Sequence, residues 1–281
     1  MIVFDFDGTL TDAEAEGAPF VRGYLEDIAR LVGRAPDDAE VAARAEAVIA
    51  DIVSRPSEHA FYWGGNAVAP ASVDPYLRMA LVADAIFDHY GAFKTASDRE
   101  PLLRSVLYRY NYEKTRSVFR DGARPLLASL RDQNVHVVTN SNTNHVCGKI
   151  AELDGGSGEV AWLTPRVVGD AGKFVVAKAA DAMPETLAMP GLARPILLRR
   201  KPYFDVLSRL LAAANQTFGD LVVVGDIFEL DLAMPLAMGA RVILMANHAT
   251  PPYEIAYVNA HARGQVARSL PEVATALQQL A

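Results

Sequence analysis

The first apolar segment of the chain ends in two aspartates one residue apart, within the run Asp5 to Thr9 (DFDGT). Successive side chains of a β-strand point to opposite faces, so Asp5 and Asp7 converge only if the strand ends at Asp5 and the chain turns at Gly8. Two converging carboxylates suit a nucleophile and a general acid–base group. The alternative is a strand that simply ends in turn-forming Asp and Gly residues.

A second acidic pair follows the all-apolar run Leu221 to Val224, as Asp226 and Asp231 in the pattern GDxxxxD. Such a run predicts a parallel strand that is buried on both faces. Ligands of α/β sheets bind at the carboxyl ends of these strands, and carboxylate oxygens there suit Mg²⁺. Acids that merely favour the start of a helix are the alternative interpretation.

Two further stretches place hydroxyl or basic groups at the ends of predicted elements. The apolar strand Val135 to Val138 closes on Thr139-Asn140-Ser141. Lys201 precedes a proline at a predicted helix start, where the helix N-terminus adds positive potential.

The basic residue of such a site has competing candidates. Arg199 and Arg200 stand directly before Lys201, and a basic tripeptide is ordinarily a solvated patch. The run Gly169 to Lys173 weakly resembles a phosphate-binding loop, but it lacks the glycine spacing and the Ser or Thr after Lys that phosphate and Mg²⁺ binding require. We therefore predict that Lys201, rather than Lys173 or Arg200, is the basic residue of the site, because Lys201 lies at a helix start that is fixed by a proline.

In this order, the four stretches resemble the motifs of the haloacid dehalogenase (HAD) superfamily, over about residues 1–12 and 119–281. The fold that this resemblance implies is α/β, with a Rossmann-like parallel sheet core (HAD-like) and a mostly α-helical cap domain. Phosphatase members of the superfamily use the first Asp as nucleophile and the second as proton donor. The resemblance implies catalytic roles for Asp5, Asp7, Thr139 and Lys201, with Ser141 as the alternative to Thr139, and substrate contacts for Thr9 and Asn140.

Four aspartates at one site repel one another unless cations balance them. The resemblance implies Mg²⁺ as the cofactor, bound by Asp5, Asp226 and the backbone carbonyl of Asp7, with Asp231 acting directly or through water. Glu229 is the alternative to Asp231 as the last metal ligand.

A block of helical periodicity, residues 13–116, lies between the first two motifs. We interpret it as the cap domain, so that residues 1–12 and 117–281 form the catalytic core. Apolar stripes or helix-start signals predict helices at Ala18 to Leu31, Pro36 to Val53 and Asp74 to Tyr90, and a fourth from Asp98 through Val106, Leu107 and Tyr110. The block also contains Arg104, Arg109 and Arg116, which either offer positive charge to a substrate or form a solvated helix face.

An aromatic cluster between the second and third helices, His59 to Asn66, breaks into glycines. Phe61, Tyr62 and Trp63 are our candidates for a loop that closes over the site and contacts the substrate, with the glycines as a hinge. The alternative is cap core followed by a turn. A second irregular stretch, Gly172 to Pro195, is predicted to be an insertion of unknown role.

The composition is that of a globular protein, with 51% hydrophobic residues. A formal charge of −7 argues against a broad nucleic-acid-binding surface, which needs clustered Lys and Arg. Cys147 is the only cysteine, so no intramolecular disulfide forms, and no run of about 18 apolar residues predicts a membrane span. We expect a cytoplasmic protein with a small phosphorylated substrate and neither nucleic acid nor membrane as partner; the oligomeric state stays open.

Three functions are compatible with these residues. The favoured one is a Mg²⁺-dependent phosphatase that hydrolyses a small phosphorylated metabolite through an aspartyl-phosphate. A phosphomutase or other phosphotransferase on the same scaffold is the second, and a non-catalytic binding module is the third. Asp7 separates this chain from haloacid dehalogenases, which lack the second Asp.

Overall fold

The computed structural model describes residues 1–103, 117–179 and 182–280. The chain divides into two compact units, each described here by itself. The larger unit consists of Met1–Asp12, Tyr62–Ala69 and Phe119–Ala281, and the helical unit consists of Ala13–Phe61 and Pro70–Val118. The segment Tyr62–Ala69 therefore belongs to the larger unit, whereas the predicted division assigned all of residues 13–116 to the helical block. The predicted helical positions Val106, Leu107 and Tyr110 and the arginines Arg104, Arg109 and Arg116 lie outside the described residues.

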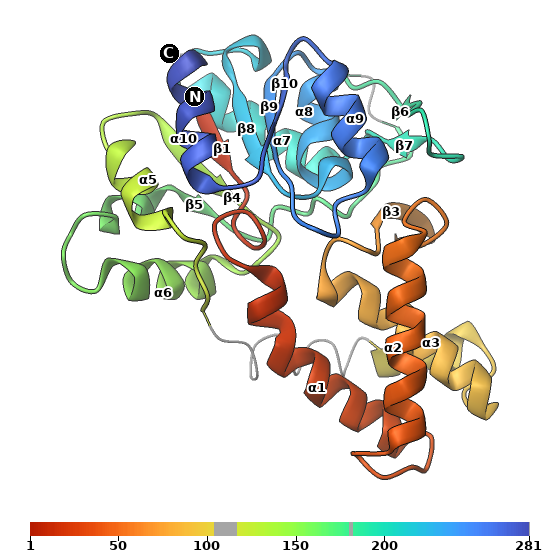
Figure 1. Ribbon diagram of the computed structural model, residues 1–281. Coiled ribbons are helices and arrows are strands. Elements are labelled where there is room, and N and C mark those ends of the chain that lie inside the picture. The colour runs from red at the N-terminus through yellow and green to blue at the C-terminus, as the bar shows by residue number, and fades with distance from the viewer. Residues whose placement is uncertain (104–116, 180–181, 281) are drawn as a thin grey trace. The chain divides into compact units, whose positions relative to one another are not determined.

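A six-stranded sheet forms the centre of the larger unit, with the strand order β10-β9-β8-β1-β4-β5 (Figure 1). Every neighbouring pair in this sheet is parallel, which confirms the predicted α/β class. Its strands are β1 (Ile2–Phe4), β4 (Val135–Val138), β5 (Val167–Val168), β8 (Val222–Gly225), β9 (Arg241–Met245) and β10 (Gly264–Ala267).

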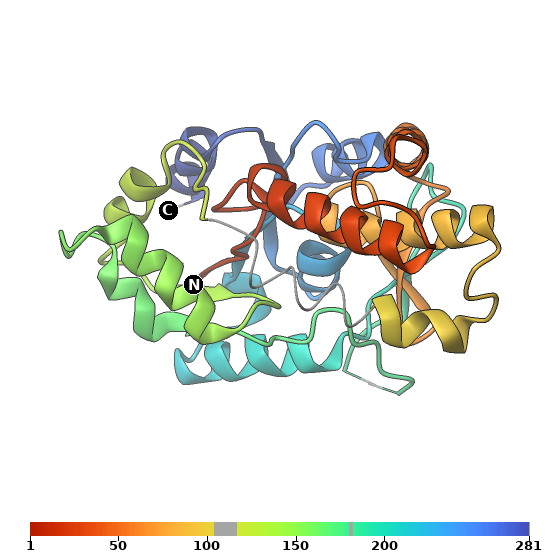
Figure 2. The same cartoon turned by 90° about the horizontal axis from the view of Figure 1, so that it is seen from below.

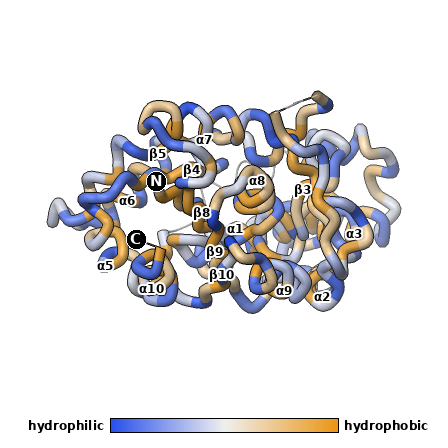
Figure 3. The backbone as a smooth tube through the Cα atoms, turned by 90° about the horizontal axis from the view of Figure 1, so that it is seen from above, coloured by the Kyte–Doolittle hydropathy of each residue, from blue (hydrophilic) through white to orange (hydrophobic). Residues whose placement is uncertain are grey.

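Both faces of the sheet are buried, because alternate residues of each strand enter two separate apolar clusters. Val3 and Val223 belong to one cluster, whereas Phe4 and Val224 belong to the other. Helices α7 (Lys201–Ala213), α8 (Ala233–Ala237) and α9 (Pro252–Ala260) contribute to the first cluster, and α5 (Ala123–Ser129), α6 (Thr143–Asp154) and α10 (Leu270–Leu280) to the second. The strands accordingly carry hydrophobic colours in Figure 3.

The register of the central strands aligns their carboxyl ends. Phe4 of β1 lies opposite Val137 of β4 on one side and Val224 of β8 on the other. Because parallel strands all end at the same edge, the residues that follow them, including Asp5 and Asp226, begin their loops side by side.

Three of the helices that the structure describes in the helical unit pack around an apolar core (Figures 1 and 2), and residues 96–103 are helical as well. The three are α1 (Ala13–Leu31), α2 (Ala39–Ser54) and α3 (Pro75–Tyr90), close to the predicted spans. Both ends of α3 are capped: the Asp74 side chain accepts a hydrogen bond from the Tyr76 N–H at its start, and Gly91 ends the helix in the left-handed conformation.

The aromatic cluster forms a β-hairpin rather than the expected loop. Its strands are β2 (Ala60–Trp63) and β3 (Asn66–Pro70). Gly64 and Gly65 make the turn with φ values of 55° and 78°, a conformation that favours glycine at both positions of a tight hairpin turn. The segment Tyr62–Ala69, which we call the hairpin tip, belongs to the larger unit.

The irregular stretch contains one strand of a second two-stranded sheet outside the main sheet. β6 (Thr186–Leu187) pairs antiparallel with β7 (Ile196–Leu197), so the apolar run at Ile196 does not join the parallel sheet. Short helical turns lie at Ala161–Arg166, Phe218–Asp220 and Phe228–Leu232. Within the described part of the chain, no helix combines the length and apolar character needed to cross a membrane.

We expect two glycine-to-alanine changes in helices to have opposite effects on stability. A Cβ at Gly17 of α1 would lie 2.5 Å from the Pro75 side chain of α3, so Gly17→Ala should lower the free energy of unfolding by about 1–3 kcal/mol through overpacking. Gly148 of α6 has no atom within 4 Å of such a Cβ, so Gly148→Ala should raise that free energy by about 0.5–1 kcal/mol. Urea unfolding measures both, and changes of the same sign would contradict the packing of α1 on α3.

Candidate active site

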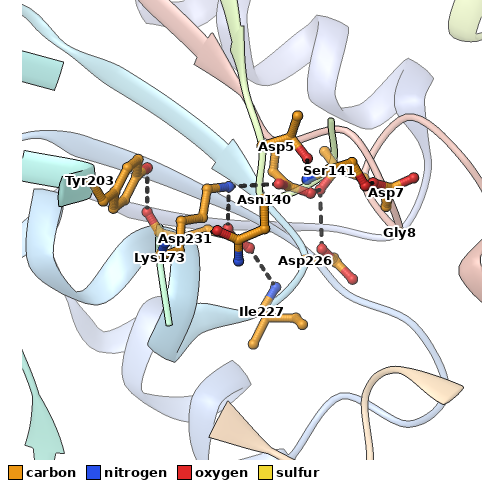
Figure 4. Close-up of polar contacts among 12 residues, drawn as sticks. Asp5, Asp7, Gly8, Asn140, Ser141, Lys173, Tyr203, Asp226, Ile227 and Asp231 are labelled. Atoms are coloured by element: carbon orange, nitrogen blue, oxygen red, sulfur yellow. Dashed lines mark hydrogen bonds and ion pairs between the residues drawn. The ribbon is translucent and has the colours of Figure 1, made fainter. Parts of the chain in front are cut away.

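Three carboxylates meet at the carboxyl edge of the sheet. Asp5 follows β1, Asp226 follows β8, and Asp231 lies in the helical turn after it. All three side chains are buried, and one oxygen of each lies within 4.8 Å of the others (Figure 4). We call these three residues the acidic cluster. The structure thus brings together three of the four aspartates that the sequence analysis selected.

Glycines allow this crowding at two positions. A Cβ at Gly8, where φ is 81°, would lie 2.1 Å from Oδ2 of Asp226, and a Cβ at Gly225 would lie 2.5 Å from Cβ of Asp231. Any larger residue would therefore push a carboxylate away. The guanidinium of Arg120 donates two hydrogen bonds, of 2.9 and 2.7 Å, to the Gly8 carbonyl and so holds the turn in place.

The lysine at this site is Lys173, and the assignment of Lys201 was wrong. The ammonium of Lys173 donates hydrogen bonds to Oδ1 of Asp5 at 2.6 Å and to Oδ1 of Asp231 at 2.7 Å. Lys201 has an exposed side chain that pairs with Asp205, one turn further along α7. Its position at the first turn of α7 directs it to solvent, so the proline-led helix start positions the helix but not this ammonium.

Backbone anchors explain how Lys173 reaches the site. It lies in the chain that leaves β5, at the same sheet edge as the acidic cluster. Its N–H donates to Oδ1 of Asn140 at 2.7 Å, and Gly172 makes the preceding turn with φ of 65°. The signal in the sequence was a Gly-Lys pair four residues after a short apolar strand, and we discarded it because the run lacks the pattern of a phosphate-binding loop.

Burial and charge oppose each other in this cluster. Burial raises the pKa of Asp5 to about 7, an effect that Lys173 opposes and the neighbouring Asp231 increases. Burial also disfavours the charge of Lys173, but the carboxylates of Asp231 and Asp5 raise its pKa above the usual value. The ammonium of Lys173 contacts two of the three carboxylates, and a further cation at this point would also offset their mutual repulsion.

Asp7 lies beside the acidic cluster with its carboxylate held separately. Ser141 donates its hydroxyl hydrogen bond to Oδ2 of Asp7 at 2.6 Å, and the ammonium of Lys149 donates to Oδ1 at 3.2 Å. The Asp7 side chain is 25% exposed, against 10% for that of Asp5. The turn at Gly8 therefore brings both aspartates to one edge, with Asp7 on the more open side.

The hydroxyl and amide residues of the site have distinct partners. The Thr9 hydroxyl lies 3.2 Å from Oδ1 of Asp226 and 3.3 Å from Oδ2 of Asp5, so it can donate to either carboxylate. The buried Thr139 accepts a hydrogen bond from the Ser141 N–H and so shapes the loop that presents Ser141 to Asp7. The side-chain oxygen of Asn140 accepts the hydrogen bond from the Lys173 N–H.

Glu229 lies outside the acidic cluster. Both of its carboxylate oxygens accept hydrogen bonds from the guanidinium of Arg194, at 2.7 and 2.8 Å. Asp231 instead accepts from the Ile227 N–H with Oδ2 while Oδ1 faces Lys173. Of the two candidates for the last metal ligand, the structure therefore places Asp231 with Asp5 and Asp226.

The three aromatic candidates differ in exposure. Phe61 is buried, whereas Tyr62 is 62% and Trp63 is 43% exposed. The Trp63 ring stacks on Phe174, the residue after Lys173, with 5.6 Å between ring centroids. Only Tyr62 and Trp63 therefore present surface to a ligand.

The donor set fits a hard divalent cation. It consists of carboxylate oxygens alone, with no sulfur or imidazole ligand in the acidic cluster, and such sets favour Mg²⁺ or Ca²⁺ over softer metals. Close approach at Gly8 leaves room for the carboxylates to converge. Asp5, Asp226 and Asp231 are the residues that would hold the ion.

Comparison with known proteins agrees with this geometry. The family model described as haloacid dehalogenase-like hydrolase matches residues 1–239. A search of curated proteins finds no significant match.

Solved structures with the same fold are similar over nearly their whole length. They include a HAD hydrolase from Bacillus subtilis bound to magnesium (17% identity, TM-score 0.53), a predicted phosphoglycolate phosphatase from Haemophilus somnus (15%, 0.55) and a haloacid dehalogenase-like protein of unknown function from Agrobacterium tumefaciens (14%, 0.53). Each comparison covers 99% of this chain and 97% of the other. At these identities, the similarity shows the fold.

We expect Mg²⁺ to raise the melting temperature by binding the acidic cluster. A ligand present at about 100 times its Kd stabilises the folded state by about 2.7 kcal/mol. Asp226→Asn should abolish the Mg²⁺-dependent shift, whereas Asp205→Asn, on the exposed side of α7, should keep it. Thermal unfolding with and without a chelator measures the shift, and an undiminished shift in Asp226→Asn would place the ion elsewhere.

Proposed function

Because the chain belongs to the haloacid dehalogenase-like hydrolase family, we propose that it is a Mg²⁺-dependent phosphatase that acts on a small phosphorylated metabolite. The observation that carries the proposal is Asp7, a second carboxylate on the open side of the acidic cluster. A departing halide needs no proton, whereas the alkoxide that leaves a phosphate ester does. A proton donor beside the nucleophile therefore favours phosphate esters as substrates.

Asp5 is the nucleophile in this proposal. Its carboxylate attacks phosphorus, the bond to the ester oxygen breaks, and an aspartyl-phosphate forms. Lys173, 2.6 Å from Oδ1 of Asp5, favours the ionised form of that carboxylate and would face the charge of the phosphoryl oxygens. The Thr9 hydroxyl, which reaches either carboxylate, restricts the orientation of Asp5.

Asp7 transfers the protons. It protonates the leaving oxygen and then takes a proton from the water that attacks the aspartyl-phosphate, which restores both aspartates. Ser141 and Lys149 donate hydrogen bonds to the two oxygens of the Asp7 carboxylate and so orient it.

Mg²⁺ would be held by Asp5, Asp226 and Asp231, where it would neutralise phosphoryl charge as a Lewis acid. The helical unit serves as the cap in this proposal, and Tyr62 and Trp63 are the side chains available to contact the leaving group. The substrate is then a small phosphorylated molecule in the cytoplasm, without nucleic acid or membrane as partner.

The proposal predicts that the purified protein hydrolyses a generic aryl phosphate only with a divalent cation. Asp5→Asn should abolish turnover, since an amide is not a nucleophile for phosphorus. Release of inorganic phosphate measures the reaction. Hydrolysis that survives both chelation and Asp5→Asn would contradict the proposed mechanism.

The correction at the lysine gives a sharper test. Lys173→Ala should lower kcat by about 10²–10³-fold, as loss of a single charge-stabilising group commonly does. Lys201→Ala removes an exposed ammonium paired with Asp205 and should leave kcat nearly unchanged. Steady-state kinetics on the same substrate compares the two, with melting temperatures as the folding control. A large loss in Lys201→Ala alone would restore the original assignment.

A further inference from the structure

Three consecutive basic residues lie at the start of α7, and only the middle one is turned inward. Arg199 pairs with Glu185 at 3.2 Å, and Lys201 pairs with Asp205. Arg200 is fully buried and is the largest side chain with no measurable exposure. Burial lowers its pKa to about 10, so the guanidinium stays charged at neutral pH.

The partners of Arg200 are backbone carbonyls. Nη1 donates to the carbonyl of Lys173 at 2.5 Å, and Nη2 donates to the carbonyl of Val68 at 2.7 Å. Nε has no hydrogen-bond partner, and among the described residues Arg200 takes part in no ion pair. The carboxylates of Glu229 and Asp231 act on the guanidinium electrostatically and oppose the lowering of its pKa. Its hydrogen bonds go to backbone carbonyls, so they fix the positions of two chain segments.

One end of this bridge is the lysine of the site. The N–H of Lys173 is fixed by Asn140, its carbonyl by Arg200, and its ammonium by Asp5 and Asp231. Removal of Arg200 would leave the carbonyl side of Lys173 without its donor. A displacement of about 1 Å at a reacting group can cost on the order of 10²-fold in rate.

The other end is the hairpin tip, Tyr62–Ala69. Val68 lies on β3, and Trp63 stacks on Phe174, so the tip contacts the Lys173–Phe174 segment both directly and through Arg200. Tyr62 and the outer part of Trp63 remain exposed on the same tip. A ligand that contacts these rings therefore also affects the position of the Lys173–Phe174 segment, which carries the ammonium.

We propose that Arg200 is a positioning residue that links the seating of the hairpin tip to the position of Lys173. The proposal rests on the proposed phosphatase function, since it makes transfer of the phosphoryl group to Asp5 efficient only while the hairpin tip keeps its contacts with Arg200 and Phe174. A substrate that contacts the hairpin tip then stabilises the contacts that position Lys173. A substrate too small to reach the tip gains rate only while those contacts form without its help.

The test uses Trp63 as a reporter, independent of activity. The chain has two tryptophans, so Trp162→Phe leaves Trp63 as the only one. In this background, Arg200→Met should raise acrylamide quenching of Trp63 and lower kcat by about 10–100-fold with little change in KM. Arg199→Met is the matched control, because the Arg199 guanidinium contacts Glu185 and the Lys178 carbonyl but neither Lys173 nor the hairpin tip, and it should change neither quantity.

The results distinguish an Arg200 that links the hairpin tip to Lys173 from an Arg200 that only stabilises its surroundings. Unchanged kcat in Arg200→Met, or a lower kcat without increased quenching, would overturn the proposal. If Arg200→Met fails to fold, Arg200→Lys keeps the charge but offers one donor head for two carbonyls, and both readouts should then change in the same direction to a smaller extent. Wild-type protein that hydrolyses no phosphate ester, while quenching still responds to Arg200→Met, would refute the phosphatase function but support the physical link.

Discussion

Three carboxylates buried within 4.8 Å of one another are the constraint on which the larger unit depends. Such a group is unstable without compensating charge, and among the described residues the ammonium of Lys173 contacts two of the three carboxylates. The remaining negative charge favours a hard cation at the same point. The glycines at positions 8 and 225 leave the space in which the carboxylates approach.

The parallel sheet brings this group together. Aligned registers in β1, β4 and β8 end their strands at one edge, and apolar helices on both faces leave that edge as the place for polar residues. Segments that are 168 and 58 residues apart in the chain from Lys173, those of Asp5 and Asp231, thereby meet its ammonium.

Positioning extends outward from the acidic cluster through backbone contacts. Arg120 holds the carbonyl of Gly8, Asn140 holds the N–H of Lys173, and Arg200 holds its carbonyl. None of these three touches a carboxylate of the acidic cluster in a described hydrogen bond, yet each determines where a reacting side chain lies. The hairpin tip belongs to the same system because Arg200 also bonds to Val68.

The sequence by itself predicted the strands β1, β4 and β8, the helices α1, α2 and α3 and the placement of Asp5 and Asp226 at strand ends, because apolar runs that end in acids have a local meaning in a parallel α/β fold. The sequence did not determine which lysine contributes its ammonium to the site. Lys201 and Lys173 both stand beside strong local signals, and the choice depends on which backbone reaches the sheet edge, a matter of contacts between distant segments. For the same reason the tertiary structure alone separated Arg200 from its two neighbours and Asp231 from Glu229: adjacent side chains of like charge diverge according to which of them the surrounding chain can bury and bond.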